Sequence, residues 1–483
     1  MYVNDTARPT FSVGRFCLMT MTALITHIRK TLGDVQTPVS VYHHVRERYP
    51  ESVLLESTDY HAAEDSTSIV AFGTLARFEA QTDGTCRLDT ALDLSAPATD
   101  VPLRQALEHV VNGTAFDQPD AALPFNGWYG LTGFEAAGAF DQVRSDAPDA
   151  PDRLPVMRYL LFRYLVVFDH FRSKLLLIEN VPPDESPTPE VFDLLLRDRS
   201  FVQNPFSLEG ESQASCTPES FLDMVQSAKE HCQRGDVFQL VVSRRFRQGF
   251  RGDDLAVYRC LRSVNPSPYL FYFDFGDFRI FGSSPEAQLV VEGGKAQIHP
   301  IAGTFPRTGN DAADFEAAGR LADDIKENAE HVMLVDLARN DLSRHCREVE
   351  VQTFKEVQFF SHVIHLVSVV EGTLREGTSA LEVFADTFPA GTLSGAPKLR
   401  ALELIRDLEP QSRSFYGGAI GLFTPGGRVN HAITIRSFLS AGGVLHSQAG
   451  AGIVIGSDPQ KELEEVNHKL GALRRALELA QTL

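Results

Sequence analysis

The sequence YLFYFDFGDFRIFGSSPEAQLVVEGGKAQIHPI occupies residues 269–301 and contains four short apolar runs in close succession. The runs are separated by turn-forming residues, and the last two are joined by Gly293-Gly294, a pair typical of a tight β-hairpin. Extended runs with such short connections predict antiparallel sheet.

Helical stretches alternate with further strands on both sides of this sheet. A helix is predicted from Thr217, with Pro218 at its first helical position, to about Arg234. Later helices are predicted at 311–342, 379–387, 397–408 and 459–483, and further strands at 237–246, 419–423, 432–439 and 445–450. The fold class is therefore α/β of a complex α+β type, in which layered antiparallel sheets carry helices packed outside.

The length of the chain predicts more than one domain. With 483 residues and 43% hydrophobic content, the chain is too long for one simple core and apolar enough to bury a large one. A loose, proline-bearing run at 204–218 marks the boundary, which gives an N-terminal domain at 21–210 and a C-terminal domain at 211–483. Residues 1–20 are predicted to be a disordered extension, because Met19 and Met21 are plausible alternative starts.

Charge and cysteine usage exclude several classes of function. The formal net charge is −19 and no basic run is long enough to track a phosphate backbone, so a nucleic-acid partner is not expected. The six cysteines are scattered without metal-binding spacing, which is typical of reduced thiols in a cytoplasmic protein. We expect no signal peptide and no membrane span, since apolar runs of about 18 residues do not occur.

Two Glu-x-x-Glu pairs, Glu327/Glu330 and Glu462/Glu465, lie in strongly helical stretches. A spacing of three residues puts both carboxylates of a pair on one helix face. Four carboxylates brought together would repel one another unless a hard cation such as Mg²⁺ lay between them, and Mg²⁺ leaves part of its shell to water and an anionic substrate. The alternative is that each pair is an ordinary solvated helix face.

Three small-residue loops could bind anionic oxygens. Two of them, at 300–304 and 450–452, are predicted to close strands and to expose backbone N–H groups. The third, at 391–398, leads into a helix whose N-terminus favours a carboxylate. Glycine turns that merely join strands are the alternative for each loop.

Six ordered motifs resemble those of the chorismate-utilising enzymes, and the likeness is greatest to the large subunits (component I) of anthranilate synthases. The motifs are GSSPE at 282–286, PIAGT at 300–304, EHVMLVDLARNDLSR at 330–344, GTLSGAPK at 391–398, YGGAIG at 416–421 and QAGAGIV at 448–454. The resemblance is dense from about Thr217 to the C-terminus and looser before it. It implies the chorismate-utilising enzyme fold, with 211–483 as the chorismate-binding catalytic domain and 21–210 as a regulatory or structural domain.

The resemblance also implies a ligand for each group of residues. Glu330 and Glu465 would hold Mg²⁺, with Glu327 and Glu462 in or next to the same shell. Arg436 is suited to a bidentate grip on a substrate carboxylate. The residues implied to bind substrate are Gly303, Thr304, Tyr416, Arg436, Gly450, Ala451 and Gly452.

Particular positions imply catalytic roles and separate the members of the family. Glu286 matches the general acid that protonates the departing hydroxyl, which requires a raised carboxyl pKa; otherwise it is an exposed glutamate at a strand start. His365 matches the histidine linked to the elimination of pyruvate, although a histidine on an apolar strand is more often a core residue. Gln239 stands where water-adding relatives carry a lysine base, and Ala302 stands where aminodeoxychorismate synthases typically carry lysine. Phe305 departs from the arginine of many anthranilate synthases.

The resemblance further implies partners and regulation. The chain has no glycine-flanked nucleophile cysteine, so a separate glutamine amidotransferase subunit is expected to supply ammonia. The family's inhibitory tryptophan site is matched by Ser57, Pro268, Tyr269 and Leu270; a strand edge packed on a turn is the alternative.

The implied activity is that of a Mg²⁺-dependent lyase that converts chorismate and ammonia to anthranilate and pyruvate in tryptophan biosynthesis, with feedback inhibition by tryptophan. Two alternatives remain open at this point. One is component I of an aminodeoxychorismate synthase, and the other is a non-catalytic subunit that senses tryptophan.

Overall fold

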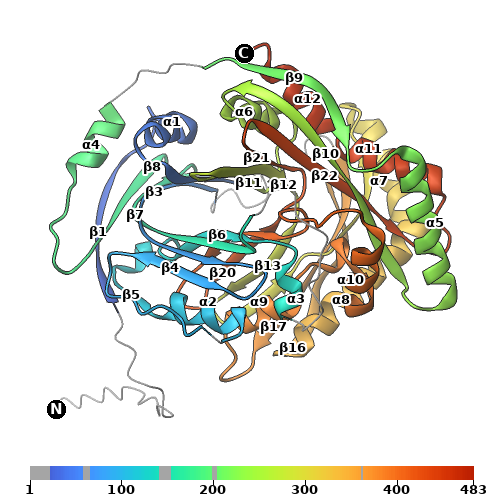
Figure 1. Ribbon diagram of the computed structural model, residues 1–483, viewed down its shortest axis with the longest axis horizontal. Helices are drawn as coiled ribbons and strands as arrows, with labels where there is room; N and C mark the ends of the chain where they lie inside the picture. The colour runs from blue at the N-terminus through green and yellow to red at the C-terminus, as the bar shows by residue number, and fades with distance from the viewer. Residues whose placement is uncertain (1–21, 58–65, 100, 141–153, 198–203, 360–362) are drawn as a thin grey trace.

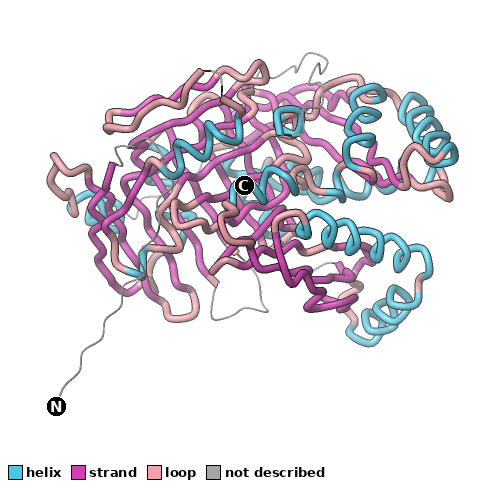
Figure 2. Tube along the Cα trace, turned by 90° about the horizontal axis from the view of Figure 1, so that it is seen from below, coloured by secondary structure: helices cyan, strands magenta, loops and turns pink. Residues whose placement is uncertain are grey.

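The computed structural model describes residues 22–57, 66–99, 101–140, 154–197, 204–359 and 363–483. The predicted disordered extension at 1–20 lies outside these residues. Strands fill the interior and helices lie outside them, most of them at one side of the molecule (Figures 1 and 2). None of the helices in the described ranges is long and apolar enough to cross a membrane.

The first part of the chain forms long strands with short helices between them. Its strands are β1 (Thr22–Leu32), β2 (Glu51–Glu56), β3 (Thr67–Ala80), β4 (Cys86–Thr90), β5 (Thr114–Asp117), β6 (Trp128–Thr132), β7 (Met157–Asp169) and β8 (Lys174–Val181). Its helices are α1 (Pro38–Arg48), α2 (Leu103–Asn112), α3 (Ala136–Phe140), α4 (Glu190–Arg197) and the 3₁₀ turn η2 (Asp120–Ala122). Trp128, at the start of β6, is fully buried and belongs to the core.

The second part adds the remaining strands and the longer helices. Its strands are β9 (Phe206–Ala214), β10 (Gln239–Gly252), β11 (Tyr269–Phe275), β12 (Phe278–Ser284), β13 (Ala287–Glu292), β14 (Lys295–Ile298), β15 (Ile301–Pro306), β16 (Cys346–Phe359), β17 (Val363–Leu374), β18 (Gly395–Ala396), β19 (Ala419–Phe423), β20 (Val429–Ile433), β21 (Ser437–Ala441) and β22 (Val444–Ile453). Its helices are α5 (Pro218–Arg234), α6 (Leu255–Val264), α7 (Asp311–Asp323), α8 (Ile325–Ser343), α9 (Ala380–Thr387), η3 (Gly391–Leu393), α10 (Lys398–Leu408), α11 (Pro459–Lys469) and α12 (Gly471–Ala480).

Strand pairing joins the two parts of the chain directly. Strand β2 pairs antiparallel with β11, and β6 pairs antiparallel with β19. The boundary predicted between residues 210 and 211 falls inside β9, which pairs with β10. The division into two domains therefore stays a prediction, with strands of one part completing sheets of the other.

The antiparallel sheet predicted for 269–301 is confirmed. Strand β11 pairs with β12, and β13 pairs with β14 across Gly293 and Gly294. Both glycines have positive φ, 57° and 79°, which the tight hairpin turn requires and which costs glycine little.

The helix predicted at 459–483 is two helices, α11 and α12, and three predictions of strands and loops also need correction. The strand predicted at 432–439 is two strands, because the chain turns at Arg436, whose φ is 47°. The loop predicted at 450–452 lies inside β22, where its residues pair with β10. The loop predicted at 300–304 mostly belongs to β15, whose pairing with β17 is irregular around Gly303. Glycine-rich strands resemble loops in sequence because they lack the apolar side chains that mark a strand.

Helix boundaries follow ordinary capping chemistry. The Thr217 side chain accepts a hydrogen bond from the backbone N–H of Ser220 at the start of α5, and Pro218 occupies the first turn as predicted. The helix predicted at 311–342 is divided at Asp324, which ends α7 and caps α8 through the backbone N–H of Glu327.

Candidate active site

Glu286 lies in the short connection between β12 and β13 and is buried, with 8% of its surface exposed. Its Oε1 atom accepts a hydrogen bond from Oγ1 of Thr392 at 3.0 Å. Burial raises the pKa of Glu286 to about 7, although this hydrogen bond and the charges of Arg436 and Lys469 oppose the rise. A carboxyl with this pKa holds a proton for much of the time at neutral pH and can donate it.

A cavity of about 30 Å³ adjoins Glu286 and is also lined by Gln288, Asp341 and Thr392. Gln288 is buried, and neither atom of its amide has a hydrogen-bond partner among the described residues. A polar cavity of this size accommodates an ordered water. The interior next to Glu286 is therefore polar as well as enclosed.

His365 lies on β17, as predicted, and is buried. Its Nδ1 donates a hydrogen bond to the carbonyl oxygen of Gly303 at 2.7 Å, which leaves Nε2 as the acceptor nitrogen. Burial lowers the pKa of His365 to about 4; the bond to Gly303 opposes this shift and the charge of Arg436 adds to it. The imidazole is therefore neutral at physiological pH.

Arg436 occupies the turn between β20 and β21. Its guanidinium interacts electrostatically with Glu286, Tyr416 and Glu465. Burial lowers its pKa, and these three acidic groups oppose that change. Lys469 of α11 donates hydrogen bonds to Glu465 at 2.7 Å and to the carbonyl oxygen of Gly450 at 2.9 Å. Two cations thus stand beside the acid, which suits a site for an anionic substrate.

Tyr416 and the segment Gly450–Gly452 are further residues that the resemblance predicts to bind substrate. Tyr416 is buried, and its hydroxyl lies 3.2 Å from the place that a Cβ atom would take on Gly450. Ala451 is buried in β22. Thr304 follows Gly303 in β15. Side chains larger than hydrogen at 450 would therefore intrude on the tyrosine.

The two glutamate pairs reach this region from different helices. On α8, Glu330 accepts a hydrogen bond from the Gln239 amide at 3.1 Å, and Glu327 lies beside Gly303. On α11, Glu465 pairs with Lys469 and Glu462 is buried. Among the described residues no three His, Cys, Asp or Glu side chains gather closely enough to form a metal-binding group. The pairs therefore approach one region without forming a compact cluster.

The residues predicted to bind an inhibitor meet at the junction of β2 and β11. Leu270 pairs with Glu56, so Ser57 lies just beyond the end of β2, close to Tyr269 and Pro268 in the register. Glu56 is buried and accepts a hydrogen bond from the Tyr258 hydroxyl at 2.7 Å. The adjoining residues 58–65 lie outside the described ranges. The register thus brings Ser57 next to the consecutive residues Pro268, Tyr269 and Leu270, which are distant from it in the sequence.

Sequence reasoning missed two residues that contact the site. Thr392 stands inside the recognised GTLSGAPK motif, but its bond to Glu286 spans 106 positions of sequence. Lys469 follows Glu465 by four residues, a spacing that predicts an ion pair on a helix and could have revealed it.

The family model for chorismate-binding enzymes matches residues 51–475. This match spans most of the chain and includes every predicted site residue. The chain belongs to the family of chorismate-binding enzymes.

Within that family, the chain is similar to anthranilate synthase component 1 proteins over most of its length. It is 37% identical to the protein of Thermus thermophilus, covering 94% of this chain and 98% of that protein. It is 35% identical to the protein of Aquifex aeolicus, covering 93% and 94% of the two chains. The crystal structure of anthranilate synthase component I from Streptococcus pneumoniae superposes with a TM-score of 0.75 at 33% identity, over 84% of this chain and 92% of that one.

The fold also extends to a more distant member. The menaquinone-specific isochorismate synthase of Escherichia coli superposes with a TM-score of 0.74 at 18% identity, over 95% of each chain. At this identity the likeness concerns the fold, which confirms the predicted fold class.

Proposed function

We propose that the chain is component I of an anthranilate synthase, a Mg²⁺-dependent lyase that converts chorismate and ammonia to anthranilate and pyruvate. The observation that carries the proposal is the buried Glu286 carboxyl, whose pKa is about 7 and which accepts a hydrogen bond from Thr392. The similarity to component 1 proteins over more than nine tenths of the chain supports it.

The residues around Glu286 suit the amination of chorismate. Glu286 donates its proton to the departing ring hydroxyl, while Arg436 holds a carboxylate of the substrate through its planar fork. Gln239 cannot take a proton from water, which favours ammonia as the nucleophile because ammonia needs no base. We assign neutral His365 to the elimination of pyruvate, where Nε2 exchanges a proton. Ala302, in place of a lysine, favours anthranilate over aminodeoxychorismate.

The carboxylates near the substrate residues fit Mg²⁺ in donor type and in the space beside them. Gly452 and Gly303 have no side chains, and a Cβ at these positions would come within 3.5 Å of Glu330 and 3.3 Å of Glu327. Mg²⁺ commonly uses one or two carboxylates and leaves its other positions to substrate and water. We assign Glu330 and Glu465 as its ligands, with Glu327 and Glu462 next to them. When bound, the ion would neutralise and orient a substrate carboxylate.

A second protein is proposed to supply ammonia. The relatives are named component 1, which implies a component 2, and a glutamine amidotransferase has the required chemistry. We also propose a cytoplasmic location, because the five cysteines within the described residues are all free thiols.

Tryptophan is proposed to bind at the β2–β11 junction, next to Ser57, Pro268, Tyr269 and Leu270. The buried Glu56 carboxylate, paired with Arg262 at 3.1 Å, offers charge near a site for a zwitterionic amino acid. Feedback by the product of the branch would then act through a strand pair shared by the two parts of the chain.

One assay tests the proposed activity. Purified protein is incubated with chorismate, Mg²⁺ and an ammonium salt, and the products are followed by fluorescence and mass. Fluorescent anthranilate with equimolar pyruvate supports the proposal. Accumulation of 4-amino-4-deoxychorismate would assign the chain to the aminodeoxychorismate synthases, and absence of turnover would favour a non-catalytic tryptophan-sensing subunit.

The same assay tests the inhibitor site. Tryptophan is titrated against the native chain and against Ser57→Ala, with Ser95→Ala as the control on a surface segment. The inhibition constant should rise for Ser57→Ala alone while the uninhibited rate stays unchanged. Equal inhibition of all three proteins would place the inhibitor elsewhere.

A further inference from the structure

Arg413 lies between α10 and β19 and is almost completely enclosed, with 1% of its surface exposed. Its Nε and Nη2 atoms donate to the Glu409 carboxylate at 3.0 and 2.5 Å. The remaining bonds go to main-chain carbonyl oxygens, from Nη1 to Leu393 at 2.6 Å and from Nη2 to Val241 at 2.8 Å. One guanidinium thus joins three separate segments of the chain.

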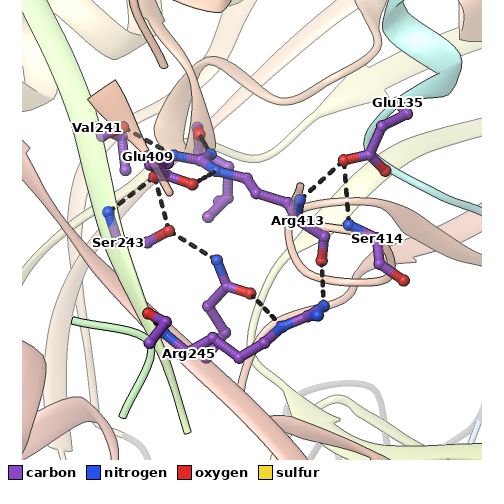
Figure 3. A network of polar contacts seen from close by, with 10 residues as sticks. Glu135, Val241, Ser243, Arg245, Glu409, Arg413 and Ser414 are labelled. Atoms are coloured by element: carbon purple, nitrogen blue, oxygen red, sulfur yellow. Dashed lines mark hydrogen bonds and ion pairs between the residues drawn. The ribbon is translucent and has the colours of Figure 1, made fainter. Parts of the chain in front are cut away.

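Arg413 is itself one member of a closed ring of polar contacts (Figure 3). Glu409 accepts hydrogen bonds from the backbone N–H and the hydroxyl of Ser243, at 2.9 and 2.8 Å. Ser243 accepts from the Gln448 amide, Gln448 accepts from Arg245, and Arg245 donates to the carbonyl oxygen of Arg413. Because each member has its partner, the ring has a single stable arrangement.

The ring touches several segments that form the active site. Leu393 directly follows Thr392, the residue whose hydroxyl donates to Glu286. Val241 pairs with Gly452. The guanidinium also lies over the ring of Tyr416, with 5.7 Å between the charge centre and the ring centroid. None of these segments is close to another in sequence.

We propose that Arg413 is a positioning residue that holds Thr392 against Glu286 through the carbonyl of Leu393. The inference rests on the proposed function in one respect, that Glu286 is the general acid. A planar fork with five N–H donors can bind Glu409 and two carbonyls at once, whereas a lysine ammonium has three donors on one atom. Lysine at 413 would keep the charge and lose the fixed spacing between β10 and η3.

Charge alone does not explain the position of Arg413. The charged groups that act on Glu286 are Arg436 and Lys469, and Asp341 lines the adjoining cavity. Arg413 is not among these groups, and the change Arg413→Lys keeps its positive charge, so we expect little change in the field at Glu286. A change in the proton affinity of Glu286 in that variant would come from a displaced Thr392.

The test measures the titration of Glu286 by infrared spectroscopy in the full chain with Mg²⁺ present. The carbonyl band of the protonated acid is assigned by its loss in Glu286→Gln. Thr392→Val should raise the pKa, because it removes the hydrogen bond that stabilises the carboxylate. Arg413→Lys should also raise the pKa of Glu286. The variant that combines Arg413→Lys with Thr392→Val should show no further shift. This lack of additivity is the signature of action through Thr392.

Arg158→Lys is the matched control. Arg158 is also buried, ion-paired with Glu79 at 2.7 Å, and bonded to the carbonyl of Phe275 at 3.1 Å, but it contacts none of the residues around Glu286. The variant Arg158→Lys should lower the stability of the protein without changing the pKa of Glu286. If Arg413→Lys fails to fold, Ser243→Ala loosens the same ring and should give a smaller shift.

Two outcomes would overturn the inference. One is a native pKa in the folded Arg413 or Ser243 variants, and the other is a shift that adds in full to that of Thr392→Val. Because the titration needs no turnover, it stands apart from the proposed function. If Glu286→Gln kept its activity, the acid assignment would fail while the coupling between Arg413 and Thr392 could still be measured.

Discussion

Two groups of buried charges in this molecule are built in opposite ways. The Glu409 carboxylate accepts four hydrogen bonds, from Ser243 and Arg413, and the two ions form a pair with both members almost fully enclosed. The Glu286 side chain accepts a single bond from Thr392 among the described residues. Both carboxylates are buried, so the two sites differ in the number of hydrogen-bond partners that each carboxylate has.

This difference explains which group can do chemistry. Four hydrogen bonds and the ion pair with Arg413 hold the Glu409 carboxylate in one place. At Glu286 burial outweighs one hydrogen bond and the charges of Arg436 and Lys469, and the pKa rises to about 7. A carboxyl with few partners is therefore a carboxyl that can exchange a proton, and we propose that the pair of Glu409 and Arg413 holds the segments around it in place.

The largest expected effect tests whether the glutamates near the substrate residues hold a metal. Glu465→Gln should raise the barrier of the Mg²⁺-dependent reaction by several kcal/mol, because it removes a charged ligand. The rate should therefore fall on the order of 10³-fold. Glu464→Gln is the control, since its side chain is exposed on the same helix. Mg²⁺ titration of the rate, with calorimetric binding of the ion, distinguishes the two. Equal Mg²⁺ dependence in both variants would place the ion elsewhere.

The next effect tests the acid itself. Glu286→Gln should lower kcat by roughly 10²–10⁴-fold, the usual contribution of a general acid. In the native chain kcat should fall as the pH rises above about 7, since only the protonated carboxyl donates. The variant should lose this alkaline limb, and Glu292→Gln, an exposed position, should keep it. An unchanged limb in Glu286→Gln would assign it to another group.

The sequence predicted the fold class and most of the elements because hydrophobic runs and capping residues act locally. The helix after Thr217, the hairpin at Gly293-Gly294 and the strand that carries His365 needed nothing beyond their own neighbours. Sequence reasoning failed at 450–452 and 300–304, where glycines hide a strand. A glycine in a strand is explained by what approaches it, and those neighbours come from distant segments.

The sequence supplied candidate residues for the site but not their contacts. Resemblance to the family supplied Glu286, His365 and Arg436, whereas Thr392 required knowledge of how residues 106 positions apart meet. The pKa of Glu286 likewise depends on burial and on cations from other elements. Such quantities are properties of the assembled fold.

A smaller expected effect concerns the buried pair of Glu409 and Arg413. Glu409→Gln should lower the free energy of unfolding by about 3–5 kcal/mol, because it leaves the buried guanidinium of Arg413 without its counter-charge. Urea unfolding followed by circular dichroism measures this loss. Glu478→Gln breaks the exposed pair with Arg475 and should change stability little. A loss confined to the control, or equal in both, would refute the distinction between buried and surface pairs.

The smallest expected effect is a gain in stability. Replacing Glu286 should stabilise the protein, whereas replacing Glu409 should destabilise it. The pKa of Glu286 is raised from about 4.5 to about 7 on folding, so the native state binds a proton more tightly than the unfolded chain. The associated stability is complete below pH 4.5 and is lost as the pH rises to 7. Relative to the native chain, Glu286→Gln should therefore gain roughly 3 kcal/mol at pH 8 and much less at pH 4.5. Urea unfolding of both proteins at the two pH values measures the gain, and a difference that is independent of pH would mean that the buried carboxyl is not the group that titrates.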